Sequence, residues 1–409
     1  MSAFRVGIIG GGASGVFAAL SVKEQNRHIQ CTIFESASEL LDKVKISGGG
    51  RCNVTHNCFE VRELIQKYPR GGKELQSLFY RFQPEDIIDW FESRGVELKA
   101  EDDGRMFPVT DSSQTIIDCF LDELQKNQVE IKYNSRIASI SKSDSKFKIL
   151  DLHDNEYEFD AVVLATGSSK YGLQFAESFG HTIIKPVPSL FTFKINDTRI
   201  KDLSGVSVSY VETRLEVGGE KFKEQGPLLI THWGLSGPAI LKLSAFAARE
   251  LHESRYKAEL IINLLPGYSE DDISTFFQKQ KAESPKKIVY NLHPHDIPKR
   301  LWHSLLQYLA INETLTFNQI SAKMIQQIMQ QLHNARFTVG GKGVFKEEFV
   351  TAGGISLKEI DFKTMQSKQC ANLYFCGEIL DIDGITGGFN FQNAWSTGYV
   401  AGCSILKSD

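Results

Sequence analysis

The order of apolar and polar residues along the first part of the chain predicts alternating strands and helices. Apolar Phe4–Ile9 predicts a strand, 13–25 a helix, and Ile29–Glu35 a second strand. A glycine turn joins the first strand to the helix, so this segment predicts a βαβ unit. Further helices are predicted at about 84–95 and 113–127. Strands are predicted at 129–133, 136–141 and 147–152, as an antiparallel set, and at 159–167.

The pattern changes after residue 190 and returns near the C-terminus. The middle segment predicts strands at 206–217, 228–231 and 256–264, and helices near 236–252, 269–282, 296–310 and 318–333. A strand at Asn372–Glu378 and a helix at about 389–406 close the chain. We therefore predict a split α/β nucleotide-binding domain, with its first part at 1–190 and its second part at 349–409. The predicted insertions are a β-domain at 191–267 plus 334–348 and a helical domain at 268–333.

Composition excludes several classes of protein. The net charge is −4, so the chain as a whole is no obvious polyanion binder, although 191–345 carries 19 Lys and Arg against 15 Asp and Glu. No apolar run is long enough for a membrane span, and the start lacks the features of a signal peptide. Seven scattered cysteines suit free thiols in a reducing compartment. We expect a cytoplasmic protein, without a metal site because no Cys/His spacing supports one.

The first glycine turn has the spacing of a dinucleotide-binding loop. Gly10, Gly12 and Gly15 occupy the defining places of G-x-G-x-x-G, between a strand and a helix. The first allows a tight turn, the second lets a pyrophosphate approach the backbone, and the third lets the helix pack on the strand. Glu35 ends the second strand, where an acid accepts hydrogen bonds from ribose hydroxyls. The alternative is a glycine turn in another kind of α/β protein.

Two later segments favour a bound FAD over a nicotinamide cofactor that exchanges freely with solution. The strand ending at Ala165–Ser168 leads into small residues, as expected where the chain passes a dinucleotide, although such a turn is also common elsewhere. Gly387 and Gly388 lead into the last helix, whose N-terminus could stabilise negative charge on a reduced flavin. Three approach points spread over the chain suit an extended FAD.

Together, the opening fingerprint, "KISGGGRCNVTH", "THWGLSGPAIL", "VTAGGISLKEID" and "LYFCGEILDIDGITGGFNFQNAWSTGYVAG" resemble one family of bacterial flavoproteins over nearly the whole chain. That family includes aminoacetone oxidases, a bile-acid-modifying reductase and the 23S ribosomal-RNA dihydrouridine synthase. The resemblance implies a Rossmann-like FAD domain of the glutathione-reductase type, split by an inserted β-domain and a small helical domain. It also implies that FAD contacts the glycine loop, Glu35, the Lys43–Asn53 region, Glu378 and Gly388–Asn390.

The predicted cofactor-binding residues come from six places in the sequence. They are Gly10, Gly12, Ala13, Ser14, Gly15, Glu35, Lys43, Ser47, Gly50, Arg51, Cys52, Asn53, Ile137, Ala165, Thr166, Gly167, Glu378, Asp383, Gly388, Phe389 and Asn390. In "SGGGRCNVTH" the glycines let N–H groups close on the cofactor, while Arg51 and Asn53 add charge and hydrogen bonds. The broader FAD-enzyme pattern has Asp where this chain has Glu378, and Asp381 or Asp383 could take part of that contact.

No residue is assigned a catalytic role from the sequence, but two are candidates. Cys52 lies in the cofactor loop, either as a reactive thiol or as a packing residue beside the flavin. A redox pair with Cys58 is disfavoured, because five residues separate the cysteines where flavin disulfide reductases have four. His232 could act as a general acid near neutral pH, or simply as a structural hydrogen bonder.

The predicted function is an FAD-dependent oxidoreductase with NAD(P)H as the electron donor. No second G-x-G-x-x-G unit follows residue 100, so NAD(P)H would visit only transiently. The acceptor would be a C=C bond, for example that of uridine in 23S rRNA. Basic residues of the insertion could hold the RNA phosphates, or they could equally be ordinary solvated surface. These residues are Lys286, Lys287, Lys299, Arg300, Arg336, Lys342 and Lys346. One alternative is an oxidase or dehydrogenase of a small amine or another small molecule. Another is a non-enzymatic flavoprotein that binds ribosomal precursors.

Overall fold

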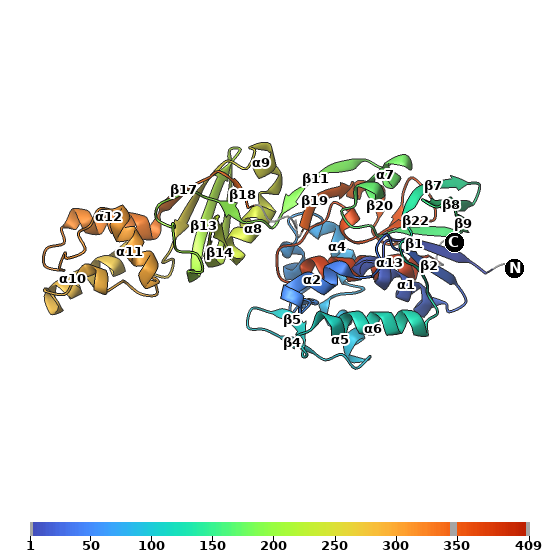
Figure 1. Ribbon diagram of the computed structural model, residues 1–409, viewed down its shortest axis with the longest axis horizontal. Coiled ribbons are helices and arrows are strands. Elements are labelled where there is room, and N and C mark those ends of the chain that lie inside the picture. The colour runs from blue at the N-terminus through green and yellow to red at the C-terminus, as the bar shows by residue number, and fades with distance from the viewer. Residues whose placement is uncertain (1–2, 344–349, 406–409) are drawn as a thin grey trace. The chain divides into compact units, whose positions relative to one another are not determined.

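The computed structural model describes residues 3–343 and 350–405. Its contacts divide the chain into two compact units, and Figure 1 shows the elements of each. Unit 1 contains Met1–Pro186 and Thr351–Asp409, and unit 2 contains Val187–Val350. Unit 1 is therefore discontinuous in sequence, with unit 2 inserted between its two segments.

Unit 1 is built on a seven-stranded sheet in the order β20-β21-β22-β10-β1-β2-β6. Its strands are β1 (Arg5–Ile9), β2 (Gln30–Phe34), β6 (Glu130–Lys132), β10 (Ala161–Leu164), β20 (Ile360–Asp361), β21 (Gln366–Ser367) and β22 (Leu373–Phe375). The five strands from β22 to β6 run parallel, which confirms the predicted α/β class. The prediction for the 129–133 strand was wrong in one respect. It joins this parallel sheet rather than the antiparallel set, because α6 (Ser113–Lys126) leads into it as a crossover helix.

Two helices from opposite ends of the chain pack against each other in unit 1. They are α1 (Ala13–Gln25) and α13 (Phe389–Ser404), which lie together in Figure 1. A Cβ atom at Gly398 would lie 2.6 Å from the carbonyl oxygen of Ser14, and one at Gly402 would lie 2.5 Å from that of Ala18. Only glycine allows the backbones to approach this closely. The N-terminus of α13 is thereby fixed relative to that of α1.

Smaller elements surround this framework. The helices are α2 (Asp42–Gly50), α3 (Val61–Leu64), α4 (Gly72–Phe79), α5 (Pro84–Glu92) and α7 (Lys170–Ser178). The strands form a sheet of β3 (Thr55–His56), β5 (Arg105–Pro108) and β4 (Leu98–Ala100), one of β7 (Ile137–Ser143), β8 (Lys146–Asp151) and β9 (Glu156–Phe159), and a pair of β11 (Ile183–Ser189) and β19 (Val350–Ile355). Helix α5 begins at Pro84 as predicted, since proline suits the first helical position.

Unit 2 combines an antiparallel sheet with helices. Its sheet has the order β17-β16-β13-β14-β15-β12-β18, made of β12 (Phe193–Lys194), β13 (Ser207–Val217), β14 (Glu220–Thr231), β15 (Gly234–Ser236), β16 (Ala258–Asn263), β17 (Ala335–Val339) and β18 (Gly341–Lys342). The helices are α8 (Pro238–Phe246), α9 (Ala248–Glu253), α10 (Glu270–Glu283), α11 (Lys299–Tyr308) and α12 (Ala322–His333). The predicted helix near 236–252 is thus two helices, because the backbone leaves helical geometry at Ala247. One continuous buried core joins the sheet to these helices.

A buried histidine in unit 1 makes stability depend on pH. The His181 side chain is fully buried, with Nδ1 3.1 Å from Glu359 Oε2 and Nε2 2.8 Å from Ser367 Oγ. Burial lowers the pKa of His181, although the Glu359 carboxylate opposes that shift. The unfolded chain therefore takes up a proton at a higher pH, near the ordinary histidine pKa of about 6.5. This stabilising contribution is complete above that pH and is lost as the pH falls below it.

We expect the free energy of unfolding to decrease as the pH is lowered from about 7.5 to about 5.5. His181 should contribute up to about 1.4 kcal/mol per pH unit to this decrease. In His181→Gln that part of the slope should disappear. Denaturant unfolding at several pH values measures it, with exposed His28→Gln as the matched control. Equal slopes in wild type and His181→Gln would contradict the assignment.

Candidate functional site

The glycine loop after β1 combines tight packing with one open position. A Cβ atom at Gly10 would lie 2.4 Å from the carbonyl oxygen of Ala165, and one at Gly15 would lie 2.0 Å from that of Gly10. At Gly12, by contrast, a Cβ atom would meet nothing within 4 Å. Gly12 is the N-cap of α1, and no described side chain caps this helix. The positive end of α1 is therefore open beside bare backbone, which suits a pyrophosphate.

Glu35 lies directly against this loop. Its Oε2 accepts a 2.8 Å hydrogen bond from the Gly11 amide, and its Oε1 accepts one of 2.8 Å from the Ala37 amide. Its backbone oxygen accepts a bond from the Ser135 amide at 2.8 Å, which brings buried Ile137 near the same corner. The Ser135 hydroxyl is buried without a hydrogen-bond partner among the described residues. Sequence reasoning missed Ser135, because a single serine in a turn carries no signal.

The strand end at Ala165–Gly167 contains a second buried polar atom that has no hydrogen-bond partner among the described residues. Ala165 is bonded to β1 through its amide and the Ile9 carbonyl, 2.9 Å apart. The hydroxyl of Thr166 is buried and has no hydrogen-bond partner within the described part of the chain. A Cβ atom at Gly172 of α7 would lie only 1.7 Å from this oxygen, so the glycine makes room for it. A buried hydroxyl without a protein partner beside the glycine loop is expected where a ligand supplies the missing bond.

The segment Ser47–Asn53 leaves helical geometry and exposes backbone. Gly48, Gly49 and Gly50 have φ of 57°, 71° and 85°, a left-handed conformation that favours glycine. A Cβ atom at Gly49 or Gly50 would meet no atom within 4 Å. The Ser47 hydroxyl bonds the Val44 carbonyl at 2.9 Å. Arg51 contacts Glu101 at 2.7 Å, and its guanidinium lies 4.0 Å from the centroid of the Phe107 ring, so its side chain already has protein partners.

Cys52 is buried in the same segment, with a positive φ of 61°. Burial raises the pKa of its thiol to about 12, so the thiolate is strongly disfavoured at neutral pH. Cys58 is also a buried free thiol. These properties favour packing over nucleophilic or redox chemistry for Cys52.

The N-terminus of α13 is joined to this segment. In the orientation of the Asn53 amide that satisfies both partners, its nitrogen donates to Thr55 O at 3.0 Å and its oxygen accepts from Gly388 N at 3.0 Å. The Asn390 side chain bonds both backbone groups of Gly384, at 2.8 and 2.9 Å. Phe389 is buried, and its carbonyl accepts from the Tyr68 hydroxyl at 2.7 Å. Sequence analysis missed Tyr68, which fixes the first turn of α13.

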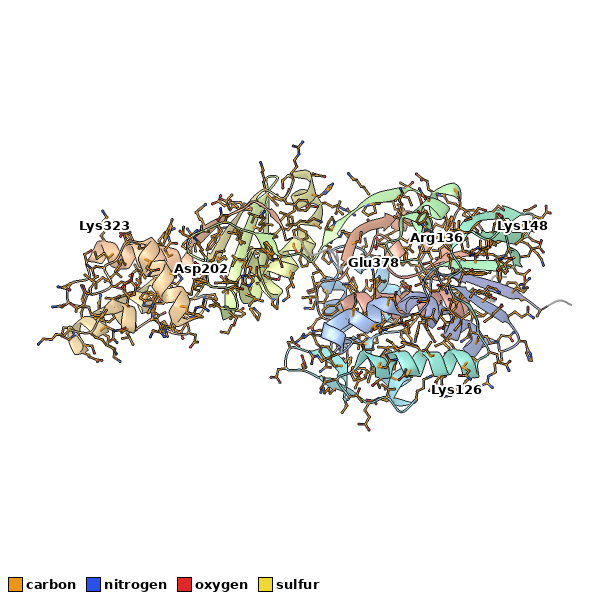
Figure 2. The ribbon with its side chains drawn as sticks, in the orientation of Figure 1. Lys126, Arg136, Lys148, Asp202, Lys323 and Glu378 are labelled. Atoms are coloured by element: carbon orange, nitrogen blue, oxygen red, sulfur yellow. The ribbon has the colours of Figure 1, made fainter. Side chains whose placement is uncertain are left out.

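Glu378, labelled in Figure 2, connects several predicted residues. Its carboxylate forms an ion pair with Lys43 and accepts a 3.0 Å bond from the Thr351 amide. A Cβ atom at Gly167 would lie 3.6 Å from Glu378 Oε2. The carboxylate of Asp383, which is also a predicted cofactor contact, is fully buried and forms an ion pair with Arg70. The side chain of Ser14 likewise has a protein partner, the Cys376 carbonyl at 3.3 Å.

His232 belongs to unit 2. It lies in the exposed turn between β14 and β15, next to Trp233, which is 52% exposed. Its role as a general acid therefore stays a prediction. Among the described residues, no group of three or more His, Cys, Asp or Glu side chains could hold a metal ion. Within the same residues, no helix is long and apolar enough to cross a membrane.

The residues of unit 1 fit FAD. Gly12 and the N-terminus of α1 would face the pyrophosphate, Glu35 the ribose hydroxyls, and the N-terminus of α13 the flavin. A bound dinucleotide would fill the open space at Gly12 and could bond the buried hydroxyls of Ser135 and Thr166, which have no hydrogen-bond partner among the described residues. When bound, FAD supplies two-electron chemistry, accepting hydride from one molecule and returning it to another.

Comparisons with known proteins identify the family of the chain. Residues 4–404 match the model described as the HI0933-like protein Rossmann domain. The chain is 30% identical to the ribosomal RNA dihydrouridine synthase of Escherichia coli (strain K12), an alignment that spans 100% of this chain and 99% of the relative. It is 26% identical to the 3-dehydro-bile acid delta(4,6)-reductase of Clostridium scindens, over 97% of this chain and 98% of the relative.

Solved structures share the fold. The open conformation of a flavocytochrome c3 fumarate reductase has a TM-score of 0.51 and 16% identity, covering 99% of this chain and 78% of the other. The 3-ketosteroid-delta4-(5alpha)-dehydrogenase of Rhodococcus jostii RHA1 has a TM-score of 0.51 and 12% identity, covering 98% and 97%. The predicted Rossmann-type FAD domain is confirmed. The chain belongs to the HI0933-like family of FAD-dependent oxidoreductases.

Proposed function

We propose that this protein uses NAD(P)H to reduce a uridine of 23S ribosomal RNA to dihydrouridine. The balanced reaction adds hydride and a proton across the C5=C6 bond and releases NAD(P)⁺. The observation that carries the proposal is the full-length match, at 30% and 29% identity, to two proteins named ribosomal RNA dihydrouridine synthase. An rRNA substrate would also place the enzyme in the cytoplasm.

The arrangement of unit 1 supports this chemistry. The helix ends and the Ser47–Asn53 segment would orient a flavin, while Glu35 and the glycine loop hold the nucleotide half. Positive potential at the N-terminus of α13 would favour the reduced, anionic form. The predicted domain limits, with a β-domain at 191–267 plus 334–348 and a helical domain at 268–333, remain part of the proposal.

Several basic residues of unit 2 are available for RNA phosphates. Lys286, Lys287 and Lys299 are exposed, and Arg300 is exposed while donating to the Asp202 carbonyl. Arg336 is paired with Glu259, which reduces its value as a phosphate contact. Lys346 lies outside the described residues. We therefore assign the predicted contact surface to the helical part of the insertion, through Coulombic attraction to the backbone.

The test uses rRNA from a strain that lacks the gene. FAD-loaded protein and NADPH are mixed with this rRNA without oxygen, and nucleosides are analysed by mass spectrometry. Formation of dihydrouridine, dependent on both NADPH and the protein, is the expected result. Absence of the product, together with unchanged uridine content in the deletion strain, would overturn the proposal. Peroxide formation with a small amine and no need for NAD(P)H would favour an oxidase instead.

A further inference from the structure

A surface cavity of unit 1 remains outside the site described above. Its volume is about 410 Å³, within the usual range for small-molecule sites. It lies between the start of α3, the end of α4 and the start of α5, and its lining includes Phe59, Arg62, Phe79, Tyr80, Arg81 and Asp86. Phe59, Arg62 and Tyr80 are exposed and are not part of the predicted flavin site.

The cavity presents two exposed aromatic rings. Phe59 is 44% exposed and Tyr80 is 67% exposed. Large aromatic side chains left in water at the mouth of one cavity offer flat apolar faces on which a nucleobase can stack. Phe79, which is buried, forms part of the wall behind them.

Two guanidinium groups accompany these rings. Arg62 and Arg81 are both exposed, and within the described residues neither forms an ion pair with a carboxylate. Arg81 uses Nη1 to donate to the Lys363 carbonyl at 2.6 Å. The planar fork of arginine suits a phosphate group. Two carboxylates also line the cavity: Asp86, which accepts from the Gln83 amide at 2.7 Å, and Glu60.

The charge balance of the cavity favours a single nucleotide over an RNA strand. An RNA strand is bound along a basic track that neutralises many phosphates. Here two arginines stand with two acids, so the cavity suits one phosphorylated nucleoside, whose ribose hydroxyls can donate to a carboxylate. A buried wall residue of the cavity also links it to the N-terminus of α13, where the flavin is expected. The Phe79 ring lies 5.5 Å from the Tyr68 ring, and Tyr68 bonds the first residue of α13.

We propose that this cavity binds the adenosine 2′-phosphate end of NADPH. The adenine stacks on Tyr80 and Phe59, and Arg62 and Arg81 contact the 2′-phosphate. The proposal rests on the proposed function, since it takes a nicotinamide dinucleotide as the donor, and it adds a preference for NADPH over NADH. It also explains how a chain without a second G-x-G-x-x-G unit holds its donor.

The test measures binding to the oxidised, FAD-loaded protein with NADP⁺, 2′,5′-ADP and NAD⁺ as probes. In Arg62→Ala/Arg81→Ala the affinity for NADP⁺ and 2′,5′-ADP should fall by about tenfold for each arginine, with NAD⁺ binding changed less than about twofold. Tyr80→Leu should weaken all three probes. Arg27→Ala, an exposed arginine before β2, is the matched control. FAD content and thermal unfolding of each variant show that it is folded.

Unchanged NADP⁺ affinity in the double arginine variant would overturn the inference, as would a wild-type protein that does not bind NADP⁺. If the same variant instead loses affinity for an rRNA fragment, the cavity belongs to the substrate and the inference is wrong. Dihydrouridine formation by the wild type is scored separately. A protein that binds NADP⁺ through Arg62 and Arg81 but never modifies RNA would refute the proposed function alone.

Discussion

Gly12→Asp is expected to lose FAD while leaving the folded chain at least as stable as wild type. Gly12 has φ −80°, which any residue can adopt, and a Cβ atom there meets no protein atom within 4 Å. Asp is also a better N-cap than glycine, by a few tenths of a kcal/mol. Its carboxylate would nevertheless face the pyrophosphate, so FAD affinity should fall by about 100-fold or more. Flavin absorbance of the purified protein and FAD titration of the apoprotein measure this.

The matched control is Gly15→Ala, which places a Cβ atom against the Gly10 carbonyl. That variant should lose stability even without FAD, by about 1–3 kcal/mol as in overpacked cores. Comparing the two apoproteins by denaturant unfolding separates the glycine that contacts ligand from the one that packs. If Gly12→Asp binds FAD with the affinity of the wild type, Gly12 does not face the pyrophosphate and the predicted FAD site is wrong.

Arg70→Ala is expected to lower the free energy of unfolding by about 3–5 kcal/mol. The Asp383 side chain is 0% exposed and that of Arg70 is 11% exposed, so truncating the arginine removes the cation that is paired with a buried carboxylate. Replacing both partners with apolar residues, as in Arg70→Met/Asp383→Leu, removes the charge and should restore about half of the loss or more. Chemical denaturation of the apoproteins measures both variants.

Lys148→Ala provides the comparison with an exposed pair. Lys148 bonds Glu156 at 2.9 Å, with the two side chains 45% and 55% exposed, so its loss should cost less than about 1 kcal/mol. FAD affinity tests the cofactor prediction for Asp383 directly. A loss of FAD binding in Arg70→Met/Asp383→Leu with normal stability would support a ligand contact and argue against a structural ion pair.

Much of the fold could be predicted because its signals are local. The strand, glycine turn, helix and strand at the N-terminus follow from hydrophobic period and Gly10, Gly12 and Gly15. Helix α2 could not be predicted, since its second half is glycine in left-handed conformation. The partner of β6 also escaped prediction, because strand pairing depends on the crossover helix before it and not on its own residues.

The candidate site shows the same division. Residues in motifs, such as Glu35, Asn53 and Gly388, could be selected from spacing or resemblance, and the structure brings Asn53 and Gly388 together. The hydroxyls of Ser135 and Thr166 are buried without a hydrogen-bond partner in the described part of the chain, and the order of residues does not reveal this burial. The strand end at Thr166 predicts a cofactor contact, whereas no feature of the sequence indicates Ser135.

The close contact between α1 and α13 has a consequence for synthesis of the protein. The glycine loop is synthesised before unit 2, whereas Gly398 and Gly402 are synthesised after it. Strand β22, which completes the parallel part of the sheet, also arrives late. A nascent polypeptide that ends within unit 2 therefore lacks part of the predicted dinucleotide site, and the α1–α13 contact can form only after α13 has been synthesised.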